Sequence, residues 1–444
     1  MFHTARSADL LHGPLRRSLL TFALPIAASS MLQQLFNAAD TAVVGRFADA
    51  DALAAVGTNG EIVALLVSLS AGLAVGANVF FAHQIGSGSR TGCKSALHTA
   101  LLLALGLGLG GLAAGQFIAL PLLQLLHTPA SVLPSAAAYL RVYFLGYPAL
   151  LLYDFGAAIL RAQGDSQRPF LILIVSGAAN LLLNLVFVIV FRWGVVGVAA
   201  ATGLSTIFSA GAVLWLLYRE AAQFSAEADT RFSTATAGHI LQVGIPAALQ
   251  GAVFCFANLF VQAAVNQFGA TATAGNAIAM NFEYFVYYLI TAFGQTVTTF
   301  VSQNHAAGQT ARCQRILREC LLLSVLSSGA LTLPLLFFRT QAAGFFSTDT
   351  AVVQAACLRM LHISALEPIC SFYEVPAGYL RGIGHSTAPA VLTILGTCLL
   401  RIFWIETIFR HCQTLPSLFW AFPASWVVTS VLLWVALLRV QKTC

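Results

Sequence analysis

Charged residues are scarce in this 444-residue chain. Asp, Glu, Lys and Arg together make up 9% of it, whereas soluble globular domains carry about 25%. Hydrophobic residues account for 58%. A water-soluble core could not hide that much apolar surface, so lipid is the expected solvent. The composition therefore predicts an integral membrane protein.

Motifs for enzymatic chemistry are also lacking. The chain contains no Walker A sequence, no GxSxG and no HExxH. Its nine cysteines show no CxxC and no metal-ligand spacing, and we interpret them as small apolar residues. We therefore predict that the protein is not an enzyme and has no cofactor. The net charge of +6 comes from basic residues dispersed among short loops, so no nucleic-acid partner is predicted.

Long apolar segments are abundant instead. Twelve can be marked, each long enough to cross about 30 Å of hydrocarbon. Their approximate bounds are 17–40, 53–83, 96–118, 136–159, 169–191, 195–217, 240–264, 277–304, 317–338, 352–377, 389–409 and 417–438. The predicted fold class is an all-α membrane protein with twelve transmembrane helices that crosses the lipid bilayer many times.

Basic residues predict the orientation of the chain. Fifteen Lys and Arg residues fall on one side of the predicted spans and four on the other. The four are Arg46, Arg192, Arg339 and Arg410. Because cytoplasmic loops carry the excess of Lys and Arg, both termini are predicted to be cytoplasmic. The expected location is the plasma membrane.

An internal repeat relates the two halves of the sequence. LTFALPIAASS, with Pro25, matches LQVGIPAALQG, with Pro246, and LRAQGDSQRP matches LRGIGHSTAP, at offsets of 220 to 222 residues. Six predicted helices separate equivalent points, so the halves have the same orientation and are expected to form two pseudo-twofold lobes. The predicted division is an N-terminal lobe over 1–218, a cytoplasmic linker over 219–238 and a C-terminal lobe over 239–444. A site between two such lobes could be reached alternately from each side of the membrane.

One polar stripe stands out in the first span, Leu19 to Val44. Ser30, Gln33, Asn37 and Asp40 follow one another at steps of three, four and three, which places them on one helix face. An acid inside the membrane costs several kcal/mol unless protein, water or a cation compensates it, so Asp40 indicates a functional site. The alternative is that Asp40 only bonds a neighbouring helix. Gln33 and Asn37 are candidate lining residues of a substrate cavity.

Four phrases of the sequence are typical of a known family: LPIAASSMLQQLFNAADTAVVGRF, GLAVGANVFFAHQIGSG and the paired LRAQGD and LRGIGHS loops. In these phrases the chain resembles the multidrug and toxic compound extrusion (MATE) family, and they look closer to its DinF-like prokaryotic branch. The resemblance implies two six-helix lobes and export of organic, often cationic, compounds in exchange for protons or sodium ions. It further implies that Asp40 is the coupling acid, with a possible Na⁺ there, and that the first helix bends at Pro25. Pro246 is its counterpart in the repeat.

The resemblance extends to a second group of residues. The family often pairs the first-helix acid with an Asn and, four residues later, an Asp on the fifth helix. Here Asn180 is present, but Asn184 stands in place of the acid, and the threonine expected on the sixth helix is Thr202. We assign these three residues to cation or proton coupling beside Asp40. A helix–helix amide bond, worth about 1 kcal/mol, is the alternative for the two asparagines.

The repeat also pairs acids and amides elsewhere in the chain. Asp154 matches Glu374 at an offset of 220, and we predict that Asp154 partly replaces the missing fifth-helix acid. Glu61 matches Glu283 at an offset of 222, where vestibule lining and a solvated helix end are equally supported. The predicted substrate cavity also includes Glu374, Glu283 and two residues of the seventh helix, Asn258 and Gln262. Asn258 is the repeat counterpart of Asn37, whereas the counterpart of Asp40 is Val261.

A buried arginine completes the set of unusual residues. Arg401 falls inside the eleventh span and needs an acidic partner; Glu374 is the expected one, with Glu406 less well placed. Together these features predict a monomeric secondary antiporter for small organic molecules that works by alternating access. The alternative is a flippase for a lipid-linked precursor, which has a related fold but is expected to have a strongly cationic cavity.

Overall fold

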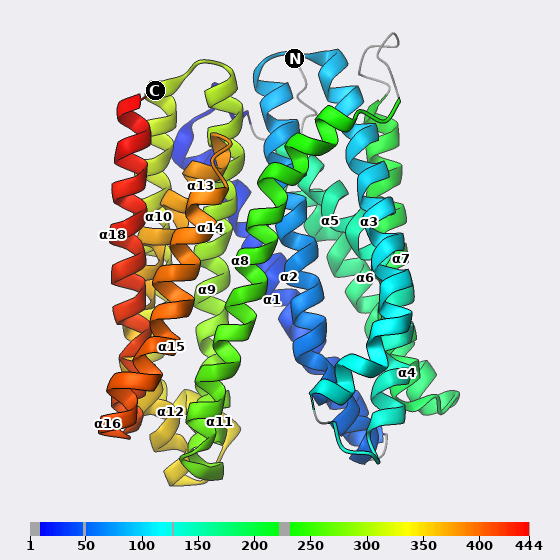
Figure 1. Cartoon of the computed structure of the whole chain (residues 1–444), viewed down its shortest axis with the longest axis vertical. Helices are drawn as coiled ribbons and strands as arrows, with labels where there is room; N and C mark the ends of the chain where they lie inside the picture. Colours follow the sequence, from blue (N-terminus) through cyan, green and yellow to red (C-terminus); the bar gives the residue numbers. More distant parts are fainter. Residues whose placement is uncertain (1–8, 48–49, 127, 222–230, 444) are drawn as a thin grey trace. The chain divides into compact units, whose positions relative to one another are not determined.

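The computed structural model describes residues 9–47, 50–126, 128–221 and 231–443 of the chain (Figure 1). Every regular element in these ranges is a helix, which confirms the predicted all-α class. Residues 222–230, in the middle of the predicted linker, lie outside the described part of the chain.

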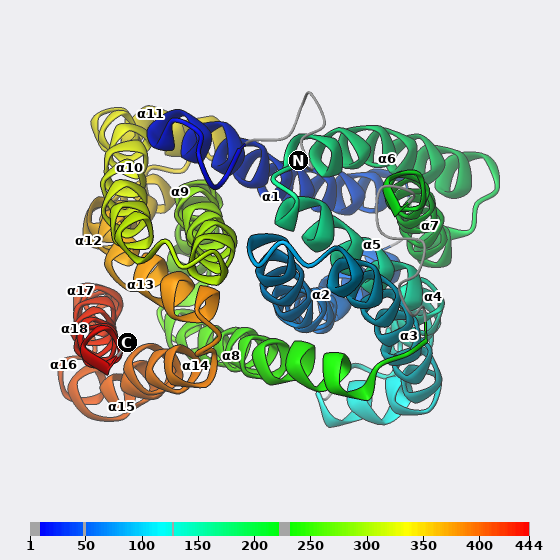
Figure 2. The same cartoon turned by 90° about the horizontal axis from the view of Figure 1, so that it is seen from above.

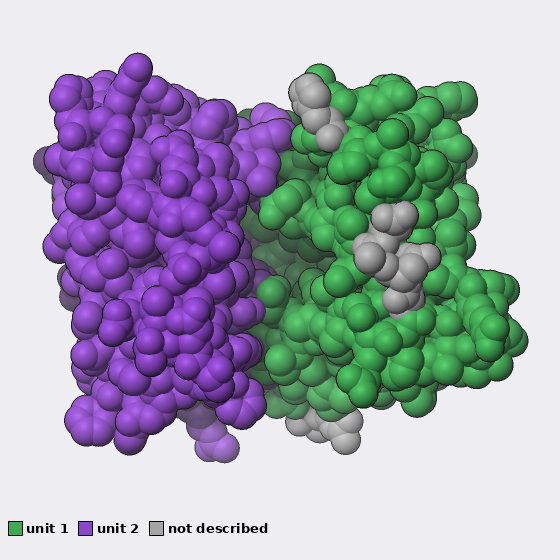
Figure 3. Space-filling model, turned by 90° about the horizontal axis from the view of Figure 1, so that it is seen from below, with its two compact units in different colours: residues 1–8, 28–248 green, residues 9–27, 249–444 purple. Residues whose placement is uncertain are grey.

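The helices belong to two units, coloured separately in Figure 3. Described residues from 28 to 248 belong to unit 1, and residues 9–27 together with those from 249 onward belong to unit 2. The division therefore falls within two helices, α1 (Leu15–Phe47) and α8 (Thr234–Asn266), and not in the expected linker. In each helix it falls two residues after a proline, Pro25 in α1 and Pro246 in α8.

Unit 1 is held together by close packing at small residues, as is usual between membrane helices. A Cβ on Gly72 would lie 2.4 Å from the Cα of Ala248, so α2 and α8 approach backbone to backbone. Besides parts of α1 and α8, the unit contains α2 (Ala50–Gly86), α3 (Arg90–Leu125), α4 (Leu133–Leu145), α5 (Tyr147–Ala162), α6 (Gln167–Leu185), the π-helical turn η1 (Val186–Val190) and α7 (Gly194–Ala221).

Unit 2 is arranged around α9 (Gly269–Ala306), which contacts α10 (Thr310–Phe337), α12 (Thr350–His362) and α13 (Ser371–Gly382), as seen from above in Figure 2. The start of α1 is anchored to this unit, because Asn304 Nδ2 donates to the carbonyl of Leu10 (3.0 Å) and Phe22 packs edge-on against Phe300 (5.4 Å). The remaining elements are α11 (Arg339–Phe346), the 3₁₀ segment η2 (Ser364–Cys370), α14 (Thr387–Thr393), η3 (Ile394–Leu399), α15 (Leu400–Trp404), η4 (Ile405–Phe409), α16 (Arg410–Cys412), α17 (Leu415–Phe419) and α18 (Ala421–Thr443).

Backbone geometry confirms the internal repeat. Gly164 and Gly384, 220 residues apart, both have φ of 89°, in the region that favours glycine. Each follows a helix that is preceded by a break: α4 and α5 meet at 45°, and α12 is separated from α13 by η2. The repeat found in the sequence is therefore also a repeat of local structure.

Ten of the twelve predicted spans meet the length and apolarity expected of a membrane span. Among the residues that the structure describes, nine are helices that are long and apolar enough alone, and α4 with α5 makes a tenth if the bent pair is one span. The other two coincide with α9 and with the α12–η2–α13 series. The central helix α9 is more polar, but its polar residues Thr296, Ser302 and Asn304 are buried within unit 2 and do not face lipid.

Candidate functional site

The position of Asp40 is determined by the packing of α1 against α6. The ring of Phe36, one turn before Asp40, occupies the space beside Gly177, where an added Cβ would lie 1.6 Å from the ring. A side chain at Gly177 would therefore displace α1. This close approach brings Asp40 to the polar face of α6, where Asn180 and Asn184 are one turn apart and both buried.

A chain of hydrogen bonds joins three helices of unit 1 at this point. Asn184 Nδ2 donates to Asp40 Oδ1 and lies 3.3 Å from Asn180 Oδ1. Asn180 Nδ2 donates in turn to the hydroxyl of Thr202 on α7 (3.3 Å), which donates to the carbonyl of Val198 (3.0 Å). The structure thus brings together four of the five residues predicted for coupling.

The charge environment of this group is unusual. None of the basic side chains in the described ranges forms an ion pair with Asp40, whose contacts come from neutral groups. The amide oxygen of Asn184 is buried and has no hydrogen-bond partner. The half-buried carboxylate of Asp40 and the unused amide oxygen of Asn184 can supply two oxygen ligands to a small cation. When Asp40 is protonated, the oxygen of Asn184 can instead accept a hydrogen bond from the acid.

Asp154, the fifth predicted coupling residue, lies apart from this group. Its Oδ2 accepts a hydrogen bond from Ser70 on α2 (2.6 Å), and it shares no hydrogen bond with the Asp40 group. Tyr139 lies near Asp40, and Tyr143 and Tyr147 lie near Asp154. Tyr139 and Tyr143 stack with ring centroids 6.3 Å apart.

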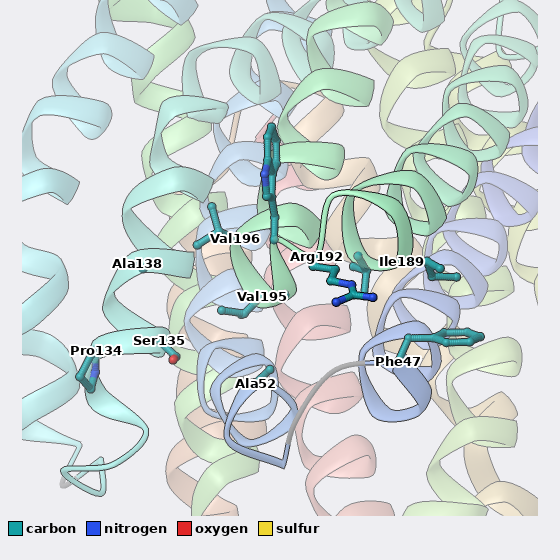
Figure 4. Close-up of a pocket in the computed structure, with 12 residues that line it drawn as sticks. Phe47, Ala52, Pro134, Ser135, Ala138, Ile189, Arg192, Val195 and Val196 are labelled. Carbon is teal, nitrogen blue, oxygen red and sulfur yellow. The ribbon is translucent and has the colours of Figure 1, made fainter.

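The predicted cavity residues on α1 have no part in the hydrogen-bonded group. Gln33 and Asn37 are both exposed, and the side chain of Asn37 forms no hydrogen bond in the described structure. A hollow of about 610 Å³ lies elsewhere in unit 1, lined among others by Phe47, Arg192 and Trp193 (Figure 4). None of the predicted site residues lines it.

In unit 2, Glu283 is buried in an ion pair. The guanidinium of Arg359 binds both carboxylate oxygens of Glu283 (2.8 and 2.7 Å), and its Nη1 donates to Asn276 Oδ1 (2.7 Å). Asn276 Nδ2 donates to Gln262 Oε1 (2.9 Å), so Gln262 belongs to the same network. The suggestion of a solvated helix end is therefore wrong for Glu283, whereas its repeat counterpart Glu61 is exposed.

The sequence analysis did not identify Arg359 as the partner of Glu283. The available signal was the pair itself: a basic residue and an acid, each inside an apolar segment, compensate each other at low cost compared with either alone. Ser70, which binds Asp154, gave no such signal, because serine is common in membrane helices.

The expected pairing of Arg401 with Glu374 is wrong. Glu374 accepts a hydrogen bond from the hydroxyl of Tyr287 (3.1 Å). Arg401 instead donates from Nε to Ser425 on α18 (3.1 Å) and from Nη1 to Asn258 on α8 (3.4 Å). Of the predicted cavity residues, Asn258 therefore binds Arg401, whereas Glu374 binds Tyr287.

No group of three or more His, Cys, Asp or Glu side chains in the described ranges is arranged to hold a metal ion. The architecture is that of a multi-pass membrane protein with acids, bases and amides paired inside its spans. Such residues mark ion and substrate paths in transporters.

Comparison with known proteins gives the family. The family model described as MatE matches residues 25–190 and 246–404. The chain therefore belongs to the MatE family of transporters, which confirms the resemblance noted in the sequence. It is a transporter and not an enzyme.

Individual relatives agree with this assignment. The chain is 29% identical over 308 residues to the probable multidrug resistance protein YpnP of Bacillus subtilis, covering 69% of each chain. It is 28% identical over 353 residues to the FAD transporter of Shewanella oneidensis, covering 78% of this chain and 77% of that protein. A solved outward-facing MATE family transporter matches 99% of this chain and 100% of its own with a TM-score of 0.91 at 21% identity, which shows the twelve-helix MATE fold.

Proposed function

We propose that the protein is a secondary active exporter that moves small organic compounds out of the cell in exchange for protons or sodium ions. The observation that carries the proposal is the environment of Asp40: a carboxylate in a membrane helix, bound by the neutral amide of Asn184, whose own amide oxygen has no hydrogen-bond partner. A purely structural acid at this depth is expected to have a basic partner. An exchangeable cation takes the place of that partner here.

Coupling requires that the ion bind the two conformations of the carrier with different affinity. Asp40 lies on the part of α1 that belongs to unit 1, whereas the helix begins in unit 2, and the division follows Pro25 closely. Proline lacks an amide donor and weakens the helix at that turn. A bend at Pro25, and its counterpart at Pro246, would change the surroundings of Asp40 between inward-open and outward-open states.

The substrate class is proposed from the relatives. Several carry names that refer to multidrug resistance, and one is named an FAD transporter. We propose that the substrates are organic, often cationic, compounds with a planar part, carried by a monomer in the plasma membrane with both termini in the cytoplasm.

The test is uptake of a fluorescent organic cation, ethidium, into everted membrane vesicles. An acid lumen or a high-sodium lumen should drive uptake, because the ion then leaves the lumen as the dye enters. Asp40→Asn should abolish gradient-driven uptake. Glu61→Gln, which removes an exposed carboxylate from the same unit, should leave it unchanged. Gradient-driven uptake at the wild-type rate in Asp40→Asn would refute the coupling role.

A further inference from the structure

Arg401 is a buried cation that the transport mechanism described above does not use. Its side chain lies in α15 and the residue is 1% exposed. Of its five N–H donors, Nε is bound by Ser425 and one at Nη1 by Asn258, and Nη2 forms no hydrogen bond to any described residue. Both partners are neutral.

Three acids of unit 2 have partners other than Arg401, whereas Glu367 is buried with no hydrogen-bond partner at Oε2. Glu374 binds Tyr287, and Glu283 is bound through both oxygens by Arg359. Glu406, five residues after Arg401, is exposed and lies 3.9 Å from Arg410. None of the ion pairs among the described residues includes Arg401. Its positive charge therefore has no carboxylate partner in the described part of the chain.

Arg359 provides an internal comparison. It too is buried, at 3% exposure, and both guanidinium groups lie over the ring of Phe422, at 5.1 Å for Arg359 and 4.2 Å for Arg401. Arginine keeps its charge in proteins, and burial of an unpaired charge costs several kcal/mol. Unit 2 compensates one of these two arginines fully and leaves the other without a carboxylate.

The surroundings of Arg401 also favour a ligand with a flat apolar body. Phe254 lies 5.7 Å from the guanidinium and stacks on Tyr287 with ring centroids 6.1 Å apart. Phe254 and Asn258, both from α8, are partly accessible. Two side chains that contact the guanidinium of Arg401, those of Phe254 and Asn258, are therefore themselves partly accessible.

We propose that Arg401 binds the anionic group, a carboxylate or a phosphate, of the transported organic compound, with Asn258 and Phe254 as its neighbouring polar and aromatic contacts. The planar fork of arginine matches both kinds of anion in a two-bond arrangement. The proposal deepens the proposed transport function and rests on it. It adds organic anions and zwitterions to the substrates, in contrast to the cations suggested by the family resemblance.

The experiment uses a matched pair of dyes, rhodamine 110, which carries a free carboxyl group, and rhodamine 123, its methyl ester. Binding of each dye to the purified full chain in lipid nanodiscs is measured by fluorescence polarisation without any ion gradient. Arg401→Gln should weaken binding of rhodamine 110 by at least about tenfold, as expected for loss of charge-assisted hydrogen bonds, with rhodamine 123 changing less than about twofold. Arg401→Lys should restore part of the binding of rhodamine 110.

The control is Arg410→Gln, which removes an exposed arginine a few turns further along the chain and should change neither affinity. Equal weakening of both dyes in Arg401→Gln would show a structural role and overturn the proposal. So would equal affinity of wild type and variant for rhodamine 110, including no measurable binding by either. Asn258→Leu keeps the arginine and should weaken rhodamine 110 selectively but less.

Failure of this inference can be told apart from failure of the transport proposal. Asp40→Asn should keep the discrimination between the two dyes, because the binding assay needs no coupling. Absence of gradient-driven transport by the wild type would count against the proposed function. An equal effect of Arg401→Gln on the affinities for the two dyes would count against the role of Arg401.

Discussion

The contact between the first and fifth helices of each repeat carries opposite charge in the two units. In unit 1, Asp40 on α1 meets Asn184 on α6. In unit 2, Asn258 on α8 meets Arg401 on α15. Arg401 follows Asn180 by 221 residues, as Asn258 follows Asn37. The π-helical turn η3 lies between Gly384 and Arg401.

The two units therefore share a helical scaffold, but the charged residue in this contact is an acid in unit 1 and a base in unit 2. Each contact joins one ionic group to a neutral amide, so neither unit compensates its own charge at this position. An acid held in this way suits a cation that comes and goes, and a base held in this way suits an anion. Under the two proposals made above, unit 1 binds the coupling ion and unit 2 binds the substrate.

The largest expected effect separates Arg359 from Arg401. Arg359→Met leaves Glu283 buried without its partner and should destabilise the protein by about 3–5 kcal/mol. Arg401→Met removes a charge that no carboxylate compensates and should cost far less, or stabilise the fold. Thermal unfolding in detergent, followed by intrinsic fluorescence, measures both. Similar losses for the two variants would show that Arg401 is compensated by groups not identified here.

The second-largest effect is expected when a second acid is introduced beside Asp40. Asn184→Asp places two carboxylates side by side, and like charges make ionisation of the pair harder. Transport should therefore need a higher pH, with the activity profile moving by about one pH unit or more. Transport measured against pH in vesicles gives the result. An unchanged profile would mean that the contact between Asp40 and Asn184 does not exist during transport.

Asp154 tests whether unit 1 has one functional acid or two. Asp154→Asn keeps the acceptor for Ser70 but removes the charge, and we expect a reduced rate with an altered pH profile. Ser70→Ala should reduce the rate by roughly threefold, the equivalent of one membrane hydrogen bond of about 0.6 kcal/mol. Normal transport by Asp154→Asn with an unaltered pH profile would assign Asp154 a structural role.

The smallest effect is expected at Asn37. It is exposed and lies outside the hydrogen-bonded group, although its counterpart Asn258 binds Arg401. Asn37→Ala should change stability by no more than about 0.5 kcal/mol and leave dye binding and transport near wild type. A loss as large as that of Asn258→Leu would make the two units alike at this position.

Much of the fold was predictable from the sequence, because lipid imposes long apolar helices and the repeat is visible in short phrases. The helix α9 was also predicted as a span, over 277–304, although it is more polar than the others; its polar residues are buried within unit 2. The division of α1 and α8 between the units was not predictable, since it depends on tertiary contacts and not on loop length.

The candidate site was predicted in part. The spacing of Asn180 and Asn184 put these two residues on one helix face. That they lie beside Asp40 was predicted from the resemblance to the MATE family. The partners of Arg401, Glu283 and Asp154 were not predictable in this way. Each lies on a helix distant in sequence, and pairing across helices depends on rotation and depth, which apolar runs do not specify.

The most direct test of the central claim is ion movement driven by substrate in proteoliposomes. An outward gradient of ethidium is imposed, and proton and sodium movement are followed with pyranine and with ²²Na⁺. The account predicts that one of these ions moves opposite to ethidium through the wild-type protein and that this movement stops in Asp40→Asn. Ion movement that persists in Asp40→Asn, or ethidium transport by the wild type with no ion moving against it, would contradict the account.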